Sequence, residues 1–163
     1  VTTDVRTWLL DPGVPIPPEA SAIHGITTEV ARAEGQDPAG AIDEIAKELA
    51  GALSSGIPVV AFNATFDLCI LQAELDRYGL PSLEDRIDGQ VAPVIDPLVL
   101  DRALDRYRRG PRKLVDLCGV YAVVGDGELH TADVDVIATL DVLHAMLARY
   151  PELAERELDA LHL

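Results

Sequence analysis

A continuous apolar run, Ile-Pro-Val-Val-Ala-Phe at residues 57–62, constrains the fold of this chain more than any other segment. The run contains β-branched side chains and no alternating polar residue, so it predicts a strand that is covered on both faces. Helical periodicity resumes at Phe66, and the following apolar side chains form one stripe made of Leu68, Leu71, Leu75 and Tyr78. A buried strand that leads directly into an amphipathic helix indicates an α/β domain.

Strand and helix signals alternate along the rest of the chain. Residues 5–10 and 91–96 predict two further strands. A short helix is predicted to start at Thr27-Thr28-Glu29-Val30, longer helices over 39–53, 66–78, 98–107, 113–121 and 132–150, and a helical tail over 152–163. This order predicts helices packed on a sheet. No repeat or linker divides the chain, so we expect one domain over 1–163, with a core of about residues 5–150 and a C-terminal tail over 151–163.

Size and composition are those of an ordinary globular domain. The chain has 163 residues, of which 48% are hydrophobic and 25% charged, and it lacks an apolar stretch long enough to span a membrane. No membrane partner and no signal peptide are therefore expected. Cys69 and Cys118 lack metal-ligand spacing, which predicts buried free thiols in a reducing, cytoplasmic location.

The net charge of −15 argues against a protein that holds nucleic acid by general electrostatic attraction. One segment is an exception. Residues 101–113 contain six basic residues against two acidic ones, a local net charge of +4, whereas the remainder has 7 basic and 26 acidic residues. The segment has two interpretations of equal weight: a surface that guides a phosphate backbone, or a solvated helix end and loop.

The first candidate functional residues follow the apolar run. Asn63 and Asp67 are expected at the carboxyl end of the strand and in the first turn of the next helix, where ligand crevices form in α/β sheets. An alternative needs no function: Asn63 or Thr65 caps the helix and Asp67 complements its dipole. Both interpretations stay open at this point.

His130 and Asp135 form the second candidate pair. Positions five apart on a helix diverge by about 140°, so the two can meet only if His130 lies in the preceding loop and Asp135 in the first helical turn. Asp135 heads a mostly apolar column of Thr139, Val142 and Met146, where an unpaired carboxylate is costly to bury. A metal ion or a backbone amide at the helix start would compensate its charge.

Other polar residues have structural interpretations. Asp133 is the nearer carboxylate to His130 and an alternative ligand, but its pattern is that of a solvated first-turn residue. His24 is interpreted as a loop histidine and His144 as a helix-surface histidine. Asp96 lies on a strand that should be buried, so a hydrogen bond to a neighbouring helix start is favoured.

Five segments resemble one family in the right order. Residues 62–67 resemble the second motif, and residues 130–135 the third motif, of the DEDDh family, the ribonuclease H-like 3′ to 5′ exonucleases that include the proofreading epsilon subunit of bacterial DNA polymerase III. Residues 23–27 resemble the loop after the family's third strand. Residues 94–97 and 113–118 resemble segments between the two motifs.

The resemblance implies a fold and a chemistry. The fold would be a ribonuclease H-like mixed sheet flanked by helices. Asp135 and Asp67 would hold two Mg²⁺ or Mn²⁺ ions, and His130 would act as general base in hydrolysis of the terminal phosphodiester of DNA or RNA. Asn63, Phe66 and the loop of His24, Gly25 and Ile26 would bind the single-stranded 3′ end. A DNA polymerase or another replication or repair protein is the implied partner; the oligomeric state is not predicted.

The chain departs from the family in one respect. Family members begin with a strand that carries an aspartate and, two residues later, a glutamate, and nothing before Val5 matches it. The match at residues 126–128 lies beside the third motif and cannot replace it. We therefore expect truncated N-terminal strands, weak metal binding and little or no nuclease activity for this chain. The rival functional hypothesis is a non-catalytic module that binds nucleic acid or a polymerase, and a third is an unrelated α/β domain with coincidental motifs.

Overall fold

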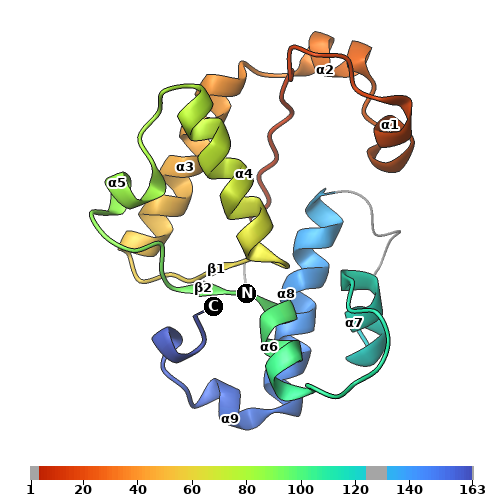
Figure 1. Ribbon diagram of the computed structural model, residues 1–163, viewed down its shortest axis with the longest axis vertical. Coiled ribbons are helices and arrows are strands. Elements are labelled where there is room, and N and C mark those ends of the chain that lie inside the picture. The colour runs from red at the N-terminus through yellow and green to blue at the C-terminus, as the bar shows by residue number, and fades with distance from the viewer. Residues whose placement is uncertain (1–3, 124–131, 163) are drawn as a thin grey trace.

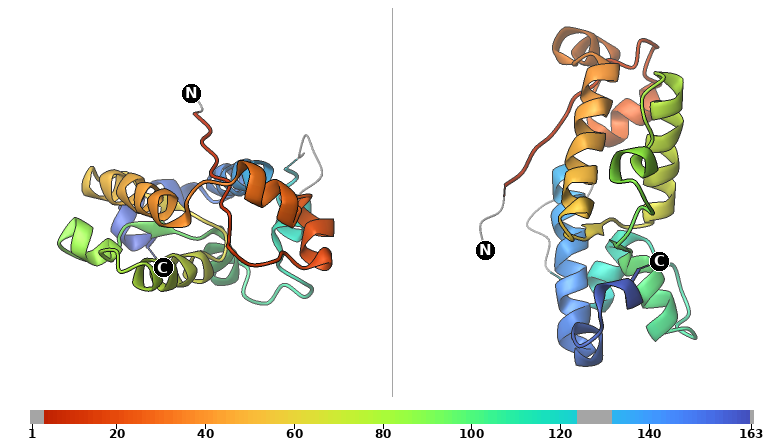
Figure 2. Two further views of the ribbon diagram at one scale, coloured as in Figure 1. Left: turned by 90° about the horizontal axis from the view of Figure 1, so that it is seen from above. Right: turned by 90° about the vertical axis from the view of Figure 1, so that its left-hand side faces the viewer.

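The computed structural model describes residues 4–123 and 132–162 as short strands between two groups of helices (Figure 1). In the views of Figure 2, α3 and α8 lie on one side of the strands and α4 and α6 on the other. The helices are α1 (Pro18–His24), α2 (Thr28–Glu34), α3 (Pro38–Ser54), α4 (Ala64–Arg77), α5 (Leu83–Ile87), α6 (Pro97–Leu104), α7 (Leu114–Val120), α8 (Ala132–Arg149) and α9 (Pro151–Ala154). The strands are β1 (Val59–Val60) and β2 (Val94–Ile95), and a 3-10 turn covers Leu158–Ala160. Within these described residues, no helix is both long and apolar enough to cross a membrane.

The sheet is small and parallel. Val59 pairs with Val94 and Val60 with Ile95, and the amide of Ala61 donates to the carbonyl of Ile95 at 3.2 Å. The predicted strands over 57–62 and 91–96 are thus confirmed in position, although each is shorter than expected. The mixed sheet implied by the family resemblance is not formed by residues 4–123 and 132–162, whose one sheet has two strands.

The prediction of a strand over residues 5–10 is wrong. This segment makes only an isolated parallel bridge, between Leu10 and Gln36. Side chains hold it beside α3 instead, because Arg6 pairs with Glu44 and Glu48 and the indole of Trp8 donates to Glu44 at 3.0 Å. The segment lacks a neighbouring strand among the described residues, so its backbone has no ladder to join.

The longer helices confirm the sequence pattern, and N-cap side chains mark the starts of α2, α3, α5 and α6. Asp37 caps α3 through the amide of Gly40 at 2.9 Å, and Pro38 occupies the first helical position, where its missing amide costs nothing. Two short helices, α1 and α5, were not predicted, since one starts within a proline-rich segment and the other has five residues.

Cys118 is buried as expected, whereas Cys69 is exposed, which corrects the prediction of two buried thiols.

The C-terminal tail packs back onto the sheet. Leu153 and Leu161 are buried in one cluster with Ile95 and Leu143. The ring of His162 accepts a hydrogen bond from the amide of Val94 at 3.2 Å, on the edge of β2 that β1 does not use. The tail is helical only in α9 and the final 3-10 turn, because Pro151 ends α8 and starts a new helix.

The side chain of Asp96 connects the two segments that follow β1 and β2. Asp96 is 3% exposed and accepts hydrogen bonds from the amides of Asn63 and Ala64, each at 3.0 Å, and of Leu98 at 2.9 Å. The carboxylate of Asp96 thereby caps two helices: α6, which directly follows Asp96, and α4, which follows β1. The predicted hydrogen bond of Asp96 to a neighbouring helix start is confirmed.

A second buried carboxylate, Asp101, organises the connection between α6 and α7. Asp101 is fully buried; it accepts from the hydroxyl of Tyr121 at 2.9 Å and from Arg108 at 2.7 Å, and it pairs with Arg112. Arg112 also donates to the carbonyl of Asp105 at 2.6 Å. Burial by itself raises the pKa of Asp101, but the hydrogen bonds from Tyr121, Arg108 and Arg112 outweigh it and hold that pKa below its usual value.

Asp96→Asn should destabilise the protein by about 1–3 kcal/mol, because an amide cannot accept on both sides and leaves at least one buried backbone amide without a partner. Asp96→Ala removes all three acceptor contacts and should cost more. Urea unfolding at neutral pH measures both. Asp88→Asn, the same change at an exposed residue, is the control, and an equal loss in Asp88→Asn and Asp96→Asn would contradict the capping role.

Asp101→Asn should cost about 3 kcal/mol near neutral pH, because it leaves two partly buried guanidinium groups without their carboxylate. A folded-state pKa below the unfolded value of about 3.9 stabilises the protein above that pH, and this contribution is lost as the pH falls through the lower folded-state pKa. The difference in stability between wild type and Asp101→Asn should therefore shrink below about pH 4. Denaturant unfolding across pH tests this, and a constant difference would refute the ion-pair explanation.

Candidate functional site

A cavity of about 390 Å³ lies where β1, α4, α7 and α8 meet. Its walls combine the end of the apolar run with the starts of three helices. The lining residues are Val60, Ala61, Phe62, Asp67, Leu114, Ala132, Asp135, Val136 and Thr139. Two carboxylates from distant parts of the chain, Asp67 and Asp135, thus open into one pocket. This pocket is the candidate active site.

The turn between β1 and α4 positions Asp67 on the wall of the pocket. Asn63 makes that turn in the left-handed region, with φ 60° and ψ 43°, and asparagine tolerates this conformation better than most residues. Its side chain makes no capping hydrogen bond, which removes Asn63 from the alternative that Asn63 or Thr65 caps the helix; Asp96 accepts from the amides of Asn63 and Ala64 instead. Asp67 follows in the first turn of α4.

The environment of Asp67 disfavours its charged form. Asp67 is an exposed residue, yet partial burial of its carboxyl group raises its pKa. A backbone hydrogen bond opposes this shift and the nearby charge of Asp96 adds to it. A cation in the pocket would relieve both unfavourable effects.

Asp135 carries the most informative atom of the pocket. Its Oδ1 is buried and has no hydrogen-bond partner among the residues that the structure describes. Below it, Thr139, Val142 and Met146 are all buried, which confirms the predicted apolar column. The hydroxyl of Thr139 donates to the backbone carbonyl of Asp135 rather than to its carboxylate. A buried carboxylate oxygen without a donor needs compensation from a group outside these residues.

The third predicted catalytic residue, His130, lies outside the described residues, as do residues 126–128. Asp133 is exposed in the first turn of α8, as expected of a solvated residue. His144 is exposed on α8, which confirms its interpretation as a surface histidine.

The predicted substrate-binding residues do not line this pocket. Phe66 is 60% exposed on α4, beside Asp67, and Asn63 is exposed in the preceding turn. His24 is the last residue of α1, which corrects its interpretation as a loop histidine, and Gly25 and Ile26 follow in the connection to α2. The His24 ring accepts a hydrogen bond from the amide of Ile26 at 3.1 Å. A role for these five residues stays a prediction. Sequence reasoning missed Leu114, Val136 and Thr139 as wall residues; Leu114 lies in one of the segments that resemble the family.

The donor set of the pocket fits a divalent cation in part. Two carboxylates, one with an unpartnered buried oxygen, are the hard oxygen ligands that Mg²⁺ or Mn²⁺ accepts, often with water and substrate phosphate completing the shell. Across the described ranges 4–123 and 132–162, no group of three His, Cys, Asp or Glu side chains is placed to hold a metal ion. The described residues alone therefore predict a weakly held cation.

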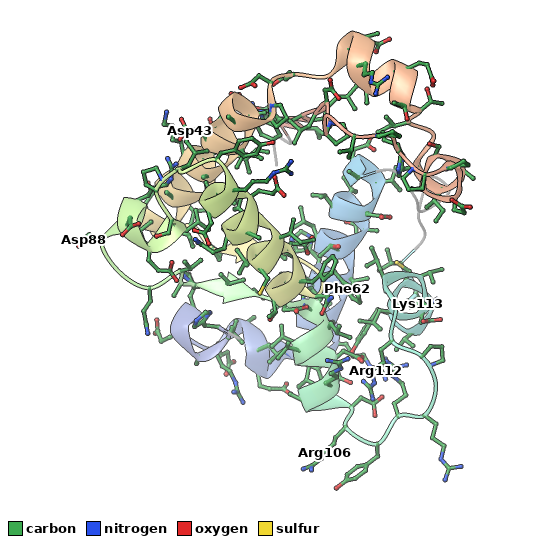
Figure 3. The ribbon with its side chains drawn as sticks, turned by 45° about the horizontal axis from the view of Figure 1, so that its top comes forward. Asp43, Phe62, Asp88, Arg106, Arg112 and Lys113 are labelled. Atoms are coloured by element: carbon green, nitrogen blue, oxygen red, sulfur yellow. The ribbon has the colours of Figure 1, made fainter. Side chains whose placement is uncertain are left out.

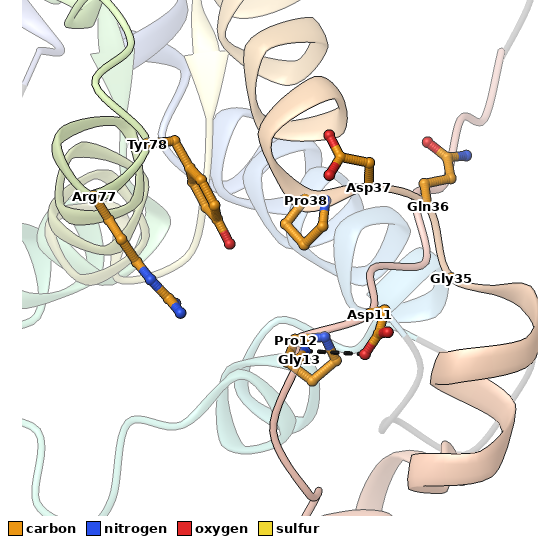
Figure 4. Close-up of a pocket in the computed structure, with 9 residues that line it drawn as sticks. All are labelled: Asp11, Pro12, Gly13, Gly35, Gln36, Asp37, Pro38, Arg77 and Tyr78. Carbon is orange, nitrogen blue, oxygen red and sulfur yellow. Dashed lines mark hydrogen bonds between the residues drawn. The ribbon is translucent and has the colours of Figure 1, made fainter.

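A second cavity, of about 380 Å³, lies at the opposite end of α4, and both carboxylates on its wall already accept hydrogen bonds from the backbone (Figure 4). Asp11 and Asp37, which lie on its wall, accept hydrogen bonds from the backbone amides of Gly13 and Gly40 at 2.9 Å. Arg77 pairs with Glu74 at 3.4 Å. Its charged groups serve turns and helix ends, so Asp67 and Asp135 remain the better candidate site.

Comparison with known proteins gave one match. A search of curated proteins found no match to the chain. The family model described as Exonuclease, of the RNase T type, matches residues 5–143, a range that contains both Asp67 and Asp135. Because this match covers well over half of the chain, the protein belongs to that exonuclease family.

Proposed function

We propose that this domain is a metal-dependent 3′ to 5′ exonuclease whose active site is the pocket of Asp67 and Asp135. The observation that carries the proposal is the buried, unpartnered Oδ1 of Asp135 in the pocket that also holds Asp67. Membership in the exonuclease family gives the reaction class, hydrolysis of nucleic acid, and a general use of divalent metal ions. The direction of cleavage, the use of two ions and the identity of the base are the added parts of the proposal.

Asp67 and Asp135 would hold the ions. Each lies in the first turn of its helix, α4 or α8, on the wall of a pocket that is open to a phosphate. When bound, divalent cations supply charge neutralisation at the scissile phosphate and activate the attacking water. His130 would accept the proton of that water, since an unperturbed imidazole exchanges protons near neutral pH. Asn63, Phe66 and residues 24–26 would contact the terminal nucleotide, and Phe66 offers an exposed ring for stacking.

The remaining parts of the assignment rest on sequence alone. A single domain, a cytoplasmic location and association with a DNA polymerase or another replication or repair protein stay predictions. Both DNA and RNA remain candidate substrates.

A non-catalytic nucleic-acid-binding module is the second candidate. One observation favours it: only two carboxylates line the pocket, and in the described part of the chain no third acidic, histidine or cysteine ligand joins them. For the same reason we expect slow turnover of this chain and a requirement for high concentrations of metal ion.

The proposal predicts that Mn²⁺-dependent hydrolysis of single-stranded DNA is lost by about 100-fold or more in Asp135→Asn, because the substitution removes an ion ligand without changing side-chain size. A 5′-labelled strand should shorten from its 3′ end in gel analysis, and chelation of the metal should stop the reaction. Asp141→Asn, at an exposed residue on the same helix, is the matched control.

Two results would separate the candidates. Hydrolysis that is equal in wild type and Asp135→Asn would refute the assignment of the active site. Binding of the strand without measurable hydrolysis in either protein would favour the binding module.

A further inference from the structure

The basic segment over residues 101–113 comprises the last turn of α6 and the connection to α7, and the structure divides its cations into two groups. Arg108 and Arg112 turn inward: their side chains are 17% and 13% exposed and both pair with the fully buried Asp101. Arg112 also donates to backbone carbonyls of Asp105 and Arg108. These two guanidinium groups are already used by the fold, so they cannot serve a ligand. The segment is not a uniformly basic surface.

The other four cations of the segment, Arg102, Arg106, Arg109 and Lys113, are exposed. The carboxylates of Asp101 and Asp105 are taken up by Arg108 and Arg112, and the four exposed cations form no ion pair with any described residue. Their charge is thus not cancelled locally. On a chain of net charge −15, this local excess is unusual and would attract an anion specifically to this surface.

An exposed aromatic side chain lies among these cations. Tyr107 is 88% exposed, and the guanidinium of Arg106 lies 5.9 Å from the centre of its ring. A solvent-exposed ring beside a guanidinium group contributes little to the core, but it offers a face on which a nucleobase can stack while cations of the same segment contact phosphates. We name Arg102, Arg106, Tyr107, Arg109 and Lys113 the α6–α7 patch.

The patch adjoins the candidate active site through the chain itself. Lys113 directly precedes Leu114, which lines the pocket of Asp67 and Asp135. Figure 3 shows Arg106 at the outer end of the connection, Arg112 turned toward α6, and Lys113 at the start of α7, on the side of Phe62. A strand bound along the patch would therefore be led toward the pocket.

We infer that the α6–α7 patch binds single-stranded nucleic acid upstream of the end that enters the pocket of Asp67 and Asp135. This inference rests on the proposed nuclease function and adds a second, separable binding surface to it. Arg102, Arg106, Arg109 and Lys113 contact the phosphates, and Tyr107 stacks on a base. The Asp101 network holds the connection in place, so little ordering is needed when the strand binds.

The test is the binding of fluorescein-labelled oligodeoxythymidine, followed by fluorescence anisotropy in EDTA at several salt concentrations. The double variant Arg106→Gln/Arg109→Gln should bind at least tenfold more weakly at low salt. It should also reduce the slope of log affinity against log salt by about 1.4, or about 0.7 for each lost phosphate contact. Tyr107→Ala should lose about tenfold in affinity with little change in the salt slope.

The matched control is Arg32→Gln/Arg156→Gln, which removes the same charge from two exposed cations elsewhere on the molecule that also form no ion pair with described residues. It should bind like wild type. Equal losses in the two double variants, an unaffected Tyr107→Ala, or no binding by wild type would overturn the inference. Displacement of the oligonucleotide by polyglutamate at equal charge concentration would also overturn it, because it would show a general anion surface.

Hydrolysis is a separate readout that distinguishes this inference from the proposed function. If the patch variants bind like wild type while Asp135→Asn loses hydrolysis, the patch is wrong and the active site stands. If the patch variants lose binding while Asp135→Asn hydrolyses like wild type, the patch stands as a binding surface and the active site is wrong.

Discussion

Three backbone amides converge on the buried carboxylate of Asp96, and the candidate site depends on this arrangement. The amides belong to both strand-to-helix connections, so one side chain fixes how α4 and α6 start relative to each other. The short sheet contributes few ladder hydrogen bonds of its own. Asp67, one turn into α4, therefore takes its position from a carboxylate on the other strand, whose charge also contributes to the raised pKa of Asp67.

Buried acidic groups also organise the surface charge. Asp101 draws Arg108 and Arg112 inward and leaves the other cations of residues 101–113 outside, and the same ion pairs hold the connection between α6 and α7. Asp135 shows the opposite case, since its buried oxygen lacks a donor within the described residues. A satisfied buried carboxylate stabilises the fold, whereas an unsatisfied one marks a place where a ligand can bind.

Sequence patterns predicted the long helices well because their apolar periodicity and capping signals are local. Pro38 after Asp37, and the stripe that starts at Leu68, each specify a helix without reference to the rest of the chain. The failures have non-local causes. Residues 5–10 have strand-like composition but no neighbouring strand among the described residues. Asn63 is a residue type that often caps helices, yet the backbone amides at the start of α4 donate to Asp96, which is distant in sequence.

The sequence by itself determined the order of the two strands and of the longer helices, the apolar column below Asp135 and the residue types of the candidate site, because these depend on side-chain chemistry and short-range periodicity. Only the tertiary structure decided that Asp67 and Asp135 share one pocket, that an oxygen of Asp135 is buried without a donor, and which arginines of residues 101–113 face solvent. The reason is physical: pairing and burial are relations between residues far apart in the chain. Of the six basic residues, Arg108 and Arg112 form an internal network because Asp101 is buried beside them, and the other four are exposed.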